Sequence, residues 1–291
     1  MIEHVKDPEQ LLYHYTRMST ARDHIFKTGH LKMSSFRKMN DPKESRTWKF
    51  DLIGVRSGDL TTREWDELSA KLSQRFKDHA RVLCFCRDVG PLTGNHLAEI
   101  CQRGFARARM WAQYAETHTG VCLVFDRAKL TRQVQLACAS AFAFFQGQVS
   151  YLDRHVAPDH LGHYLFNLDR HDQVGFEKYW REHAVQYWER LFFEKNADWR
   201  DEHEYRFLAF VPDTPDIYVN MADSLVGVIF GTEVDVAAED ALIEHLLPEP
   251  VRLMGLKWHN ATPWYDFGNF KYDRQLRRSP WGQAQRAKPP T

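Results

Sequence analysis

The sequence lacks any long uninterrupted apolar run. A membrane-spanning helix needs about 20 consecutive apolar residues, and no stretch of the 291-residue sequence comes near that length. The opening residues, MIEHVKDPEQ, also contain no apolar run of the kind that a signal peptide uses. These absences predict a cytoplasmic protein that does not contact the membrane.

Cysteine is scarce, and its spacing is uninformative. The five cysteines, an odd number, include no CxxC pair, so neither a disulfide framework nor a cysteine-rich zinc site is expected. His160 and His163 have a spacing that a helix can present to a metal, but histidine is plentiful and no carboxylate partner is identified. We therefore predict no metal site.

The charge shows no excess of either sign. Thirty-nine basic residues balance thirty-nine acidic ones, so the whole molecule is not drawn to nucleic acid or to an anionic membrane, and any such binding must be local. The exception is the end of the chain, where six basic residues stand against Asp273. We predict a basic, flexible tail over residues 271–291.

The sequence also lacks an internal repeat, a Gly/Ser linker and a GxGxxG loop. Its 43% apolar content is enough for a substantial core, and we predict a single α+β domain over residues 1–270. Short strands alternate with helices of irregular length. This pattern predicts a mixed, mostly antiparallel sheet flanked by helices rather than a doubly wound parallel sheet.

Several elements can be placed. Strands are predicted at residues 11–16, 31–36, 81–86, 121–125, 205–211, 225–230 and 251–256. Thr61 to Glu64 is a possible capping box before a helix. Residues 88–105 contain glycine and proline and are predicted to form an exposed loop, and Ala108 to Thr117 is predicted as a short helix closed by Gly120.

Four segments carry a family resemblance. They are LYHYT (12–16), NDPKE (40–44), MWAQYA leading into HTGVC (110–122), and Lys195 with Trp199, Glu202, Glu204 and Arg206. Each is weak alone, but in this order and spacing they are specific. Over about residues 10 to 232 the chain resembles the bacterial family catalogued as domain of unknown function 2971.

A more distant resemblance is to ADP-ribosyltransferases. Their nicotinamide sites begin with a strand of the form L-[YWH]-H-[GT]-T, continue through a serine-bearing strand and finish with a late glutamate. Residues 12–16, 33–35 and 202–204 stand in that order. The chain departs from the pattern because Tyr15 stands where some members have glycine, and no tyrosine follows Ser35. The resemblance implies an ADP-ribosyltransferase-like fold and NAD as substrate.

The resemblance also implies roles for particular residues. His14 would hydrogen-bond the ribose hydroxyls of NAD, because a neutral imidazole offers one donor and one acceptor. Tyr13, Thr16 and Ser34 would complete this NAD-binding set. The alternative is a strand histidine that bonds a neighbouring carbonyl.

Glu202 and Glu204 are the predicted catalytic pair. They lie two residues apart, so on a strand both carboxylates would face the same side, and like charges that close raise one pKa. Glu204 would stabilise the oxocarbenium-like ribose, and Glu202 would orient or deprotonate the acceptor. Arg206, on the same face, would clamp a phosphate of NAD. The alternative is a solvated edge in which the carboxylates pair with Arg200 or Arg206.

These patterns favour an NAD-dependent ADP-ribosyltransferase with a nucleic acid or protein acceptor, and family resemblance implies a toxin or phage-defence setting. The first alternative is a metal-dependent nuclease that holds magnesium with four carboxylates and contacts the phosphate through Lys195. The carboxylates are those of Asp41, Glu44, Glu202 and Glu204. However, Asn-Asp-Pro at 40–42 is also the chemistry of a sharp turn. The second alternative is a non-catalytic domain that binds nucleic acid or a partner. The sequence does not indicate the oligomeric state.

Overall fold

The structure is a computed structural model. It describes residues 2–153, 162–213, 216–248, 250–260, 262–265, 272–273 and 277–279. The chain divides into two compact units, the first made of Met1–Leu31, Phe85–Gln133 and Asn220–Thr291, the second of Lys32–Cys84 and Val134–Val219. The single domain over residues 1–270 stays a prediction. Each unit is made of several segments of the chain, and no linker separates them. The boundary between the units is therefore not marked by a change of composition in the sequence.

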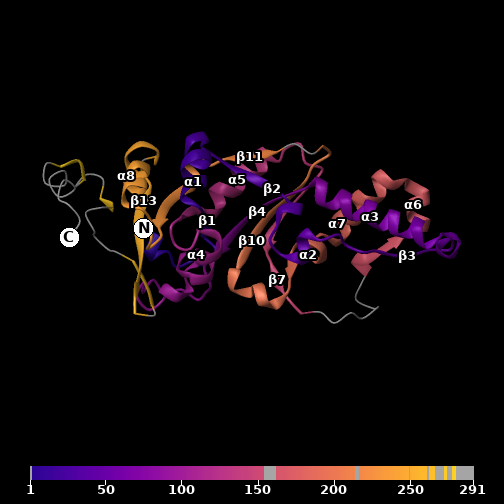
Figure 1. The fold of residues 1–291 in the computed structure, drawn as a ribbon, viewed down its shortest axis with the longest axis horizontal. Coiled ribbons are helices and arrows are strands. Elements are labelled where there is room, and N and C mark those ends of the chain that lie inside the picture. The colour runs from indigo at the N-terminus through magenta and orange to yellow at the C-terminus, as the bar shows by residue number, and fades with distance from the viewer. Residues whose placement is uncertain are drawn as a thin grey trace. The chain divides into compact units, whose positions relative to one another are not determined.

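The first unit is built on a mainly antiparallel sheet (Figure 1). Its strands in spatial order are the end of β4 (Ala80–Arg87), β1 (Leu11–Thr16), β5 (Val121–Asp126), β12 (Leu225–Phe230), β13 (Arg252–His259) and β14 (Thr262–Tyr265). Only β12 and β13 pair in parallel among these described strands. The helices are α1 (Met18–Thr20) with the π-helix Ala21–Phe26, α4 (Ala108–Tyr114), the start of α5 (Arg127–Ala137) and α8 (Val236–His245).

The prediction of an exposed loop at residues 88–105 is wrong at both ends of that segment. Asp88 and Arg103 are 0% and 1% exposed, and Arg103 Nη1 lies 3.1 Å from Asp88 Oδ2. The Gly104 amide donates to Asp88 Oδ1 at 2.7 Å, and the Phe105 carbonyl accepts from the buried Trp111 indole at 2.7 Å. A buried ion pair folds the segment back into the core. Glycine and proline in the sequence do not reveal such a long-range pair.

Helix α4 ends in a left-handed turn. Glu116, Thr117 and His118 have φ values of 50°, 52° and 68°, although a side chain with a Cβ disfavours this region by roughly 1–2 kcal/mol per residue. The sequence predicted that Gly120 would close this helix. Gly120 instead allows close approach, because a Cβ there would lie 2.3 Å from the Thr16 carbonyl oxygen.

Thr117→Gly should raise the free energy of unfolding by about 1 kcal/mol. Glycine removes the cost of placing a β-branched residue in the left-handed region. Part of this gain is lost because glycine also increases the conformational entropy of the unfolded chain. Thr117→Ala is the matched control because alanine keeps the Cβ, and it should gain much less. Urea unfolding of both variants measures the difference. A glycine variant no more stable than the alanine variant would show that the turn carries no strain.

The second unit contains the other strands. Their spatial order is β11 (Ile217–Asn220), β2 (His30–Ser35), β4, β10 (Glu204–Phe210) and β6 (Ala143–Gln148). Two small parallel ladders join β3 (Asp51–Ile53) to β8 (Leu165–Asn167) and β7 (Ser150–Tyr151) to β9 (Glu194–Lys195). The helices are α2 (Pro42–Ser45), α3 (Thr62–His79), α6 (Leu168–Val174) and α7 (Phe176–Phe192). The predicted fold class, a mixed and mostly antiparallel sheet flanked by helices, is confirmed.

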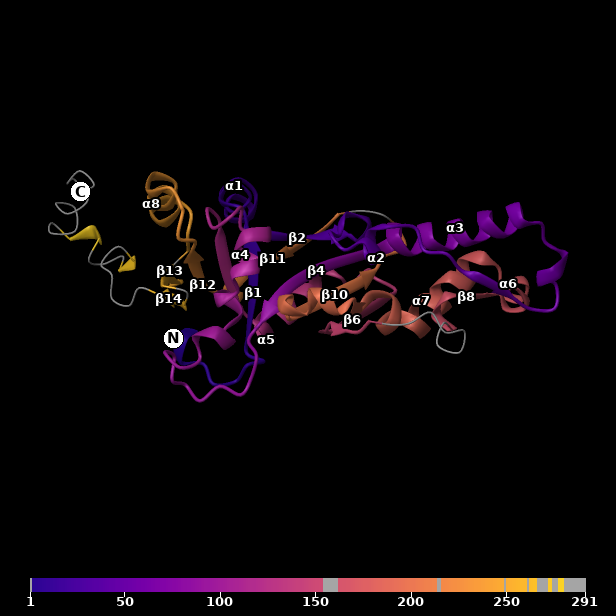
Figure 2. The same cartoon turned by 60° about the horizontal axis from the view of Figure 1, so that its bottom comes forward.

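Helices α3 and α7 lie side by side in both ribbon views (Figure 2). The predicted capping box is confirmed: Thr61 Oγ1 accepts from the Glu64 amide, and the Thr61 amide donates to Glu64 Oε2 at 2.9 Å. Phe76 and Trp180 are fully buried between the two helices, with ring centroids 6.4 Å apart. This aromatic packing forms the core of the second unit.

His183 on α7 has a defined tautomer. Its Nε2 lies 2.9 Å from the His163 carbonyl oxygen, so Nε2 carries the proton. Nδ1 then accepts from the Tyr179 hydroxyl at 3.4 Å, and that hydroxyl accepts from the Asn167 amide at 2.7 Å. Burial lowers the pKa of His183 to about 4. The neutral imidazole thus links α7 to the chain at residues 163–167.

This depressed pKa predicts an acid-labile fold. The unfolded chain takes up a proton on His183 near pH 6.5 and the folded chain only near pH 4, so this stability is present above pH 6.5 and is lost as the pH falls toward 4. The stability difference between wild type and His183→Gln should shrink by about 3 kcal/mol between pH 7 and pH 4. Leu191→Ala, on the same helix, should differ from wild type equally at both pH values. A constant difference for His183→Gln would contradict the prediction.

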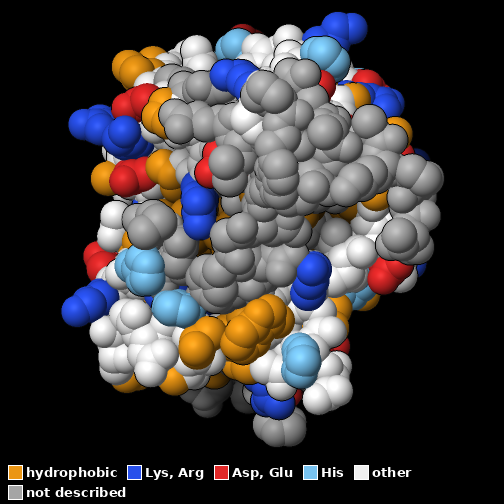
Figure 3. Space-filling model, turned by 90° about the vertical axis from the view of Figure 1, so that its left-hand side faces the viewer, with side chains coloured by type: hydrophobic (Ala, Val, Ile, Leu, Met, Phe, Trp, Pro, Cys, Tyr) orange, Lys and Arg blue, Asp and Glu red, His pale blue; other side chains and the backbone are white. Residues whose placement is uncertain are grey.

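Most of the predicted tail, residues 271–291, lies outside the described residues. Arg277 is described: it is 2% exposed, and its Nη2 lies 3.0 Å from both Asp240 Oδ1 and Glu244 Oε1 of α8. On the face drawn in Figure 3, acidic and basic side chains of the described residues are interspersed. Within the described residues, no helix is both long and apolar enough to cross a membrane.

Candidate functional site

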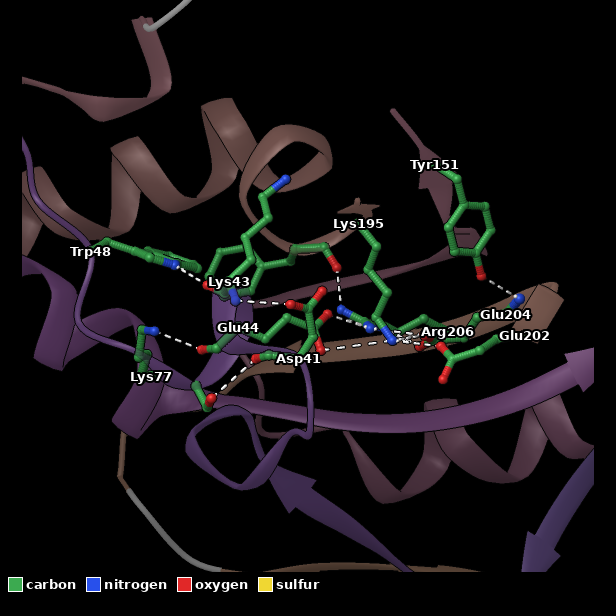
Figure 4. A network of polar contacts seen from close by, with 12 residues as sticks. Asp41, Lys43, Glu44, Trp48, Lys77, Tyr151, Lys195, Glu202, Glu204 and Arg206 are labelled. Atoms are coloured by element: carbon green, nitrogen blue, oxygen red, sulfur yellow. Dashed lines mark hydrogen bonds and ion pairs between the residues drawn. The ribbon is translucent and has the colours of Figure 1, made fainter. Parts of the chain in front are cut away.

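A buried ionic cluster lies in the second unit (Figure 4). Its members are Asp41, Glu44, Lys195, Glu202, Glu204 and Arg206, which are between 0% and 4% exposed. They come from four short elements: the start of α2, the strand β9, the 3-10 helix Ala197–Glu202 and the start of β10. Charged side chains are rarely buried this deeply unless they pair with one another.

Lys195 is the centre of the cluster. Its Nζ lies 2.8 Å from Glu202 Oε2, 2.8 Å from Glu204 Oε2 and 3.9 Å from Glu44 Oε2. Burial alone lowers the pKa of an ammonium group, but the carboxylates of Glu204 and Glu44 outweigh that effect and raise the pKa of Lys195. The lysine is therefore charged throughout the physiological range.

Arg206 makes a two-pronged contact with Glu204. Nε lies 2.6 Å from Oε1 and Nη2 lies 3.1 Å from Oε2, and both residues project from the same face of β10, as their spacing predicted. Nη2 is also 2.6 Å from Glu44 Oε1, and Nη1 donates to the Phe192 carbonyl. The guanidinium is thus engaged inside the protein. Its predicted role as a phosphate clamp stays a prediction.

Glu202 and Glu204 meet for a reason other than the predicted one. The sequence placed both on one strand, but Glu202 ends a 3-10 helix and only Glu204 belongs to β10. His203 between them is left-handed, with φ 44°. This turn, rather than strand alternation, brings both carboxylates to Lys195.

The pKa values of the two carboxylates beside Arg206 shift in opposite directions. Burial raises the pKa of Glu204, but Arg206 and Lys195 together lower it well below its ordinary value. For Glu44, burial prevails over the same two cations and the pKa is raised. Arg206 Nη2 lies 2.6 Å from Glu44 Oε1, but among the described residues no well-aligned donor reaches either Glu44 oxygen.

Helix α3 explains how Glu44 is positioned. Ser69, Ser73 and Lys77 recur every four residues and so share one face of α3. The serine hydroxyls accept from the amides of Phe50 and Trp48 at 2.8 and 2.9 Å, and Lys77 donates to the carbonyls of Glu44 and Arg46. Burial lowers the pKa of Lys77 to about 8.

The start of α2 is held locally as well. Asp41 is the N-cap residue, its Oδ1 accepts from the Lys43 amide at 2.8 Å, and Pro42 occupies the first turn. The turn predicted from Asn-Asp-Pro is therefore present. It also delivers Glu44 to the cluster, a function that the turn chemistry alone does not indicate. The sequence grouped Glu44 with Glu202 and Glu204 only in the nuclease alternative.

The other predicted NAD-binding residues are distributed over both units. Tyr13 on β1 is fully buried, and its hydroxyl donates to Asp88 Oδ2 at 3.1 Å. Thr16 ends β1 and is 7% exposed, and the half-buried His14 ring lies 5.5 Å from Phe85. Ser34 on β2 is half-buried and belongs to the second unit. Their roles in NAD binding stay predictions.

The cluster does not resemble a metal centre. Among the described residues, no three or more His, Cys, Asp or Glu side chains form a group that could hold a metal ion. The carboxylates of Glu202 and Glu204 instead face the ammonium of Lys195. This arrangement does not fit the magnesium ion of the nuclease alternative. His160 lies outside the described residues.

Residues 110–207 match the model of a protein family described as protein of unknown function (DUF2971). The matched range contains Lys195, Glu202, Glu204 and Arg206, and it supports the resemblance to that family. No curated protein and no solved structure matches the chain.

Lys195→Met should lower the free energy of unfolding by roughly 3–5 kcal/mol, because it leaves buried carboxylates without their shared cation. Lys43→Met is the matched control. Lys43 also pairs with a buried carboxylate, Glu194, but its side chain is 20% exposed and the distance is 3.3 Å. Its loss should cost about 1 kcal/mol or less. Urea unfolding at pH 7 measures both, and equal losses would mean that the cluster is not a centre of stability.

Proposed function

We propose that this chain is an NAD-dependent ADP-ribosyltransferase that modifies a nucleic acid or protein acceptor. The observation that carries the proposal is the convergence of Glu202 and Glu204 on Lys195, each at 2.8 Å. They stand where the resemblance expects the late glutamate. A toxin or phage-defence setting rests on the family resemblance alone.

The chemistry asks for two different carboxylates. When the bond between ribose C1′ and nicotinamide breaks, the electron pair leaves with nicotinamide and positive charge develops on the ribose. An anion held in a preorganised, buried site stabilises that charge. The lowered pKa of Glu204 keeps it ionised. The acceptor then forms the new bond to C1′ and gives its proton to Glu202, so the products are the ADP-ribosylated acceptor, nicotinamide and one proton.

Access is a condition of this proposal. Glu202 and Glu204 are 3% and 4% exposed, so NAD must displace neighbouring groups to reach them. One such group is Tyr151, whose hydroxyl accepts from the Glu204 amide at 2.9 Å. Hydrogen exchange at the amides of residues 194–206 should therefore change when NAD is added.

The decisive measurement is transfer of label from NAD to total cell RNA, DNA and protein. Glu204→Gln keeps the shape and removes the charge, so turnover should fall by roughly 10²-fold or more, the usual cost of losing an electrostatic stabiliser. Glu202→Gln should impair transfer to the acceptor and spare slow NAD hydrolysis.

Both substitutions also disturb a buried network, so the control is Leu208→Ala, which removes buried core volume from the same strand β10 and leaves the charges in place. Assayed where all variants are folded, Leu208→Ala should retain transfer. Full activity in Glu204→Gln would remove the mechanism. Absence of transfer and of NAD binding in wild type would leave the non-catalytic binding domain, and activity abolished by chelation alone would favour the nuclease.

A further inference from the structure

The strand β6 forms an edge of the sheet in the second unit, beside β10 (Figure 2). The Val149 amide, one residue past the end of β6, donates to the Glu204 carbonyl at 3.0 Å. Backbone groups alternate in direction along a strand, so the odd-numbered residues of β6 bond β10. The amides and carbonyls of Phe144 and Gln146 therefore point away from β10.

The outer side of β6 is open. Within the ranges that the structure describes, β10 is the only strand that pairs with β6. The Gln146 side chain is exposed and Phe144 is half-buried. An edge of this kind offers its outward N–H and C=O groups to another strand.

β6 also lacks the devices that protect most edge strands, which are usually very short or carry a charge or a proline. The edge strand β14 contains Pro263, and the edge strand β11 has four residues and follows Asp216, which pairs with Lys32. β6 has six residues, AFFQGQ, without charge or proline. Residues 133–152 around it contain no Asp, Glu, Lys or Arg, although 27% of the chain is charged.

This missing charge favours a second copy of the chain as the partner of β6. In an antiparallel pair around a two-fold axis, each residue lies opposite its own equivalent or a residue close to it in sequence, so a charge in the strand would meet a like charge. The uncharged run avoids that repulsion. A charged peptide from another protein would find no opposite charge on the strand.

We propose that two copies of the chain pair antiparallel through their β6 strands, with Gln146 at the two-fold axis. Phe145 of each copy then lies opposite Gly147 of the other, in a pair without mutual hydrogen bonds, where the strands approach most closely. The Phe145 ring, which stacks on Trp188 with centroids 4.5 Å apart, can cover the bare glycine backbone. Because the inner side of β6 is bound to β10, the assembly stops at two copies. This pairing does not depend on the proposed transfer reaction.

Sedimentation velocity of the full chain over a series of concentrations tests the pairing. Wild type should form a dimer. Gln146→Lys and Gln146→Glu should each weaken the dimer by about tenfold or more, because two like charges then meet at the axis. An equimolar mixture of the two variants should form the dimer again, since a lysine then faces a glutamate. Variants that had lost their fold could not recover in this way.

Tyr218→Lys is the matched control, because Tyr218 is 53% exposed on the other edge strand, β11. It should dimerise like wild type. Hydrogen exchange of the amides in residues 143–148 should be slower in wild type than in Gln146→Lys, which locates the contact. A monomeric wild type, which would leave β6 open to a strand of a different protein, would overturn the proposal. Dimers that persist in both Gln146 variants, or a mixture that stays monomeric, would also overturn it.

Discussion

The second unit depends on burying Lys195 without leaving it unpaired. Moving a charge from water into a protein interior costs several kcal/mol per ion even after relaxation, so the ammonium is tolerable only where the carboxylates of Glu202 and Glu204 approach it at 2.8 Å. Those carboxylates are equally costly without Lys195 and Arg206. The elements that carry them must therefore come together as a set, which makes the cluster a condition for folding as well as a candidate site.

The supporting contacts reflect the same constraint. Glu44 contributes to the cluster only if the short helix α2 is held in place, and a helix of one turn has little stability of its own. Helix α3 supplies that support through Lys77, which donates to the Glu44 and Arg46 carbonyls. In the first unit, the ion pair of Asp88 and Arg103 likewise holds residues 88–105 against the core. In both places a buried ionic group orders a segment that has little regular structure.

The sequence predicted what local pattern determines. Alternation and apolar runs located strands such as β1 and β5, and the Thr61 capping box located the start of α3. It missed α5 and β6, and it misjudged residues 88–105, because an ion pair between Asp88 and Arg103 has no periodicity to detect. The sequence identified two members of the ionic cluster, Glu202 and Glu204. It did not predict the left-handed conformation of His203 between them, because composition does not determine it. Long-range pairing and backbone conformation account for most of the difference.

The carboxylates of the cluster differ in how well the cations hydrogen-bond to them. This difference distinguishes Glu204 from Glu44. Glu204 has two charge-assisted bonds from Arg206 and a contact with Lys195, and its pKa is lowered. Glu44 faces the same cations, but its oxygens have no well-aligned donor in the described part of the chain, and its pKa is raised. A proton that enters the cluster is therefore taken up more readily by Glu44 than by Glu204. The contacts that keep Glu204 ionised do not offset the burial of Glu44, so the two carboxylates respond differently to the same pair of cations.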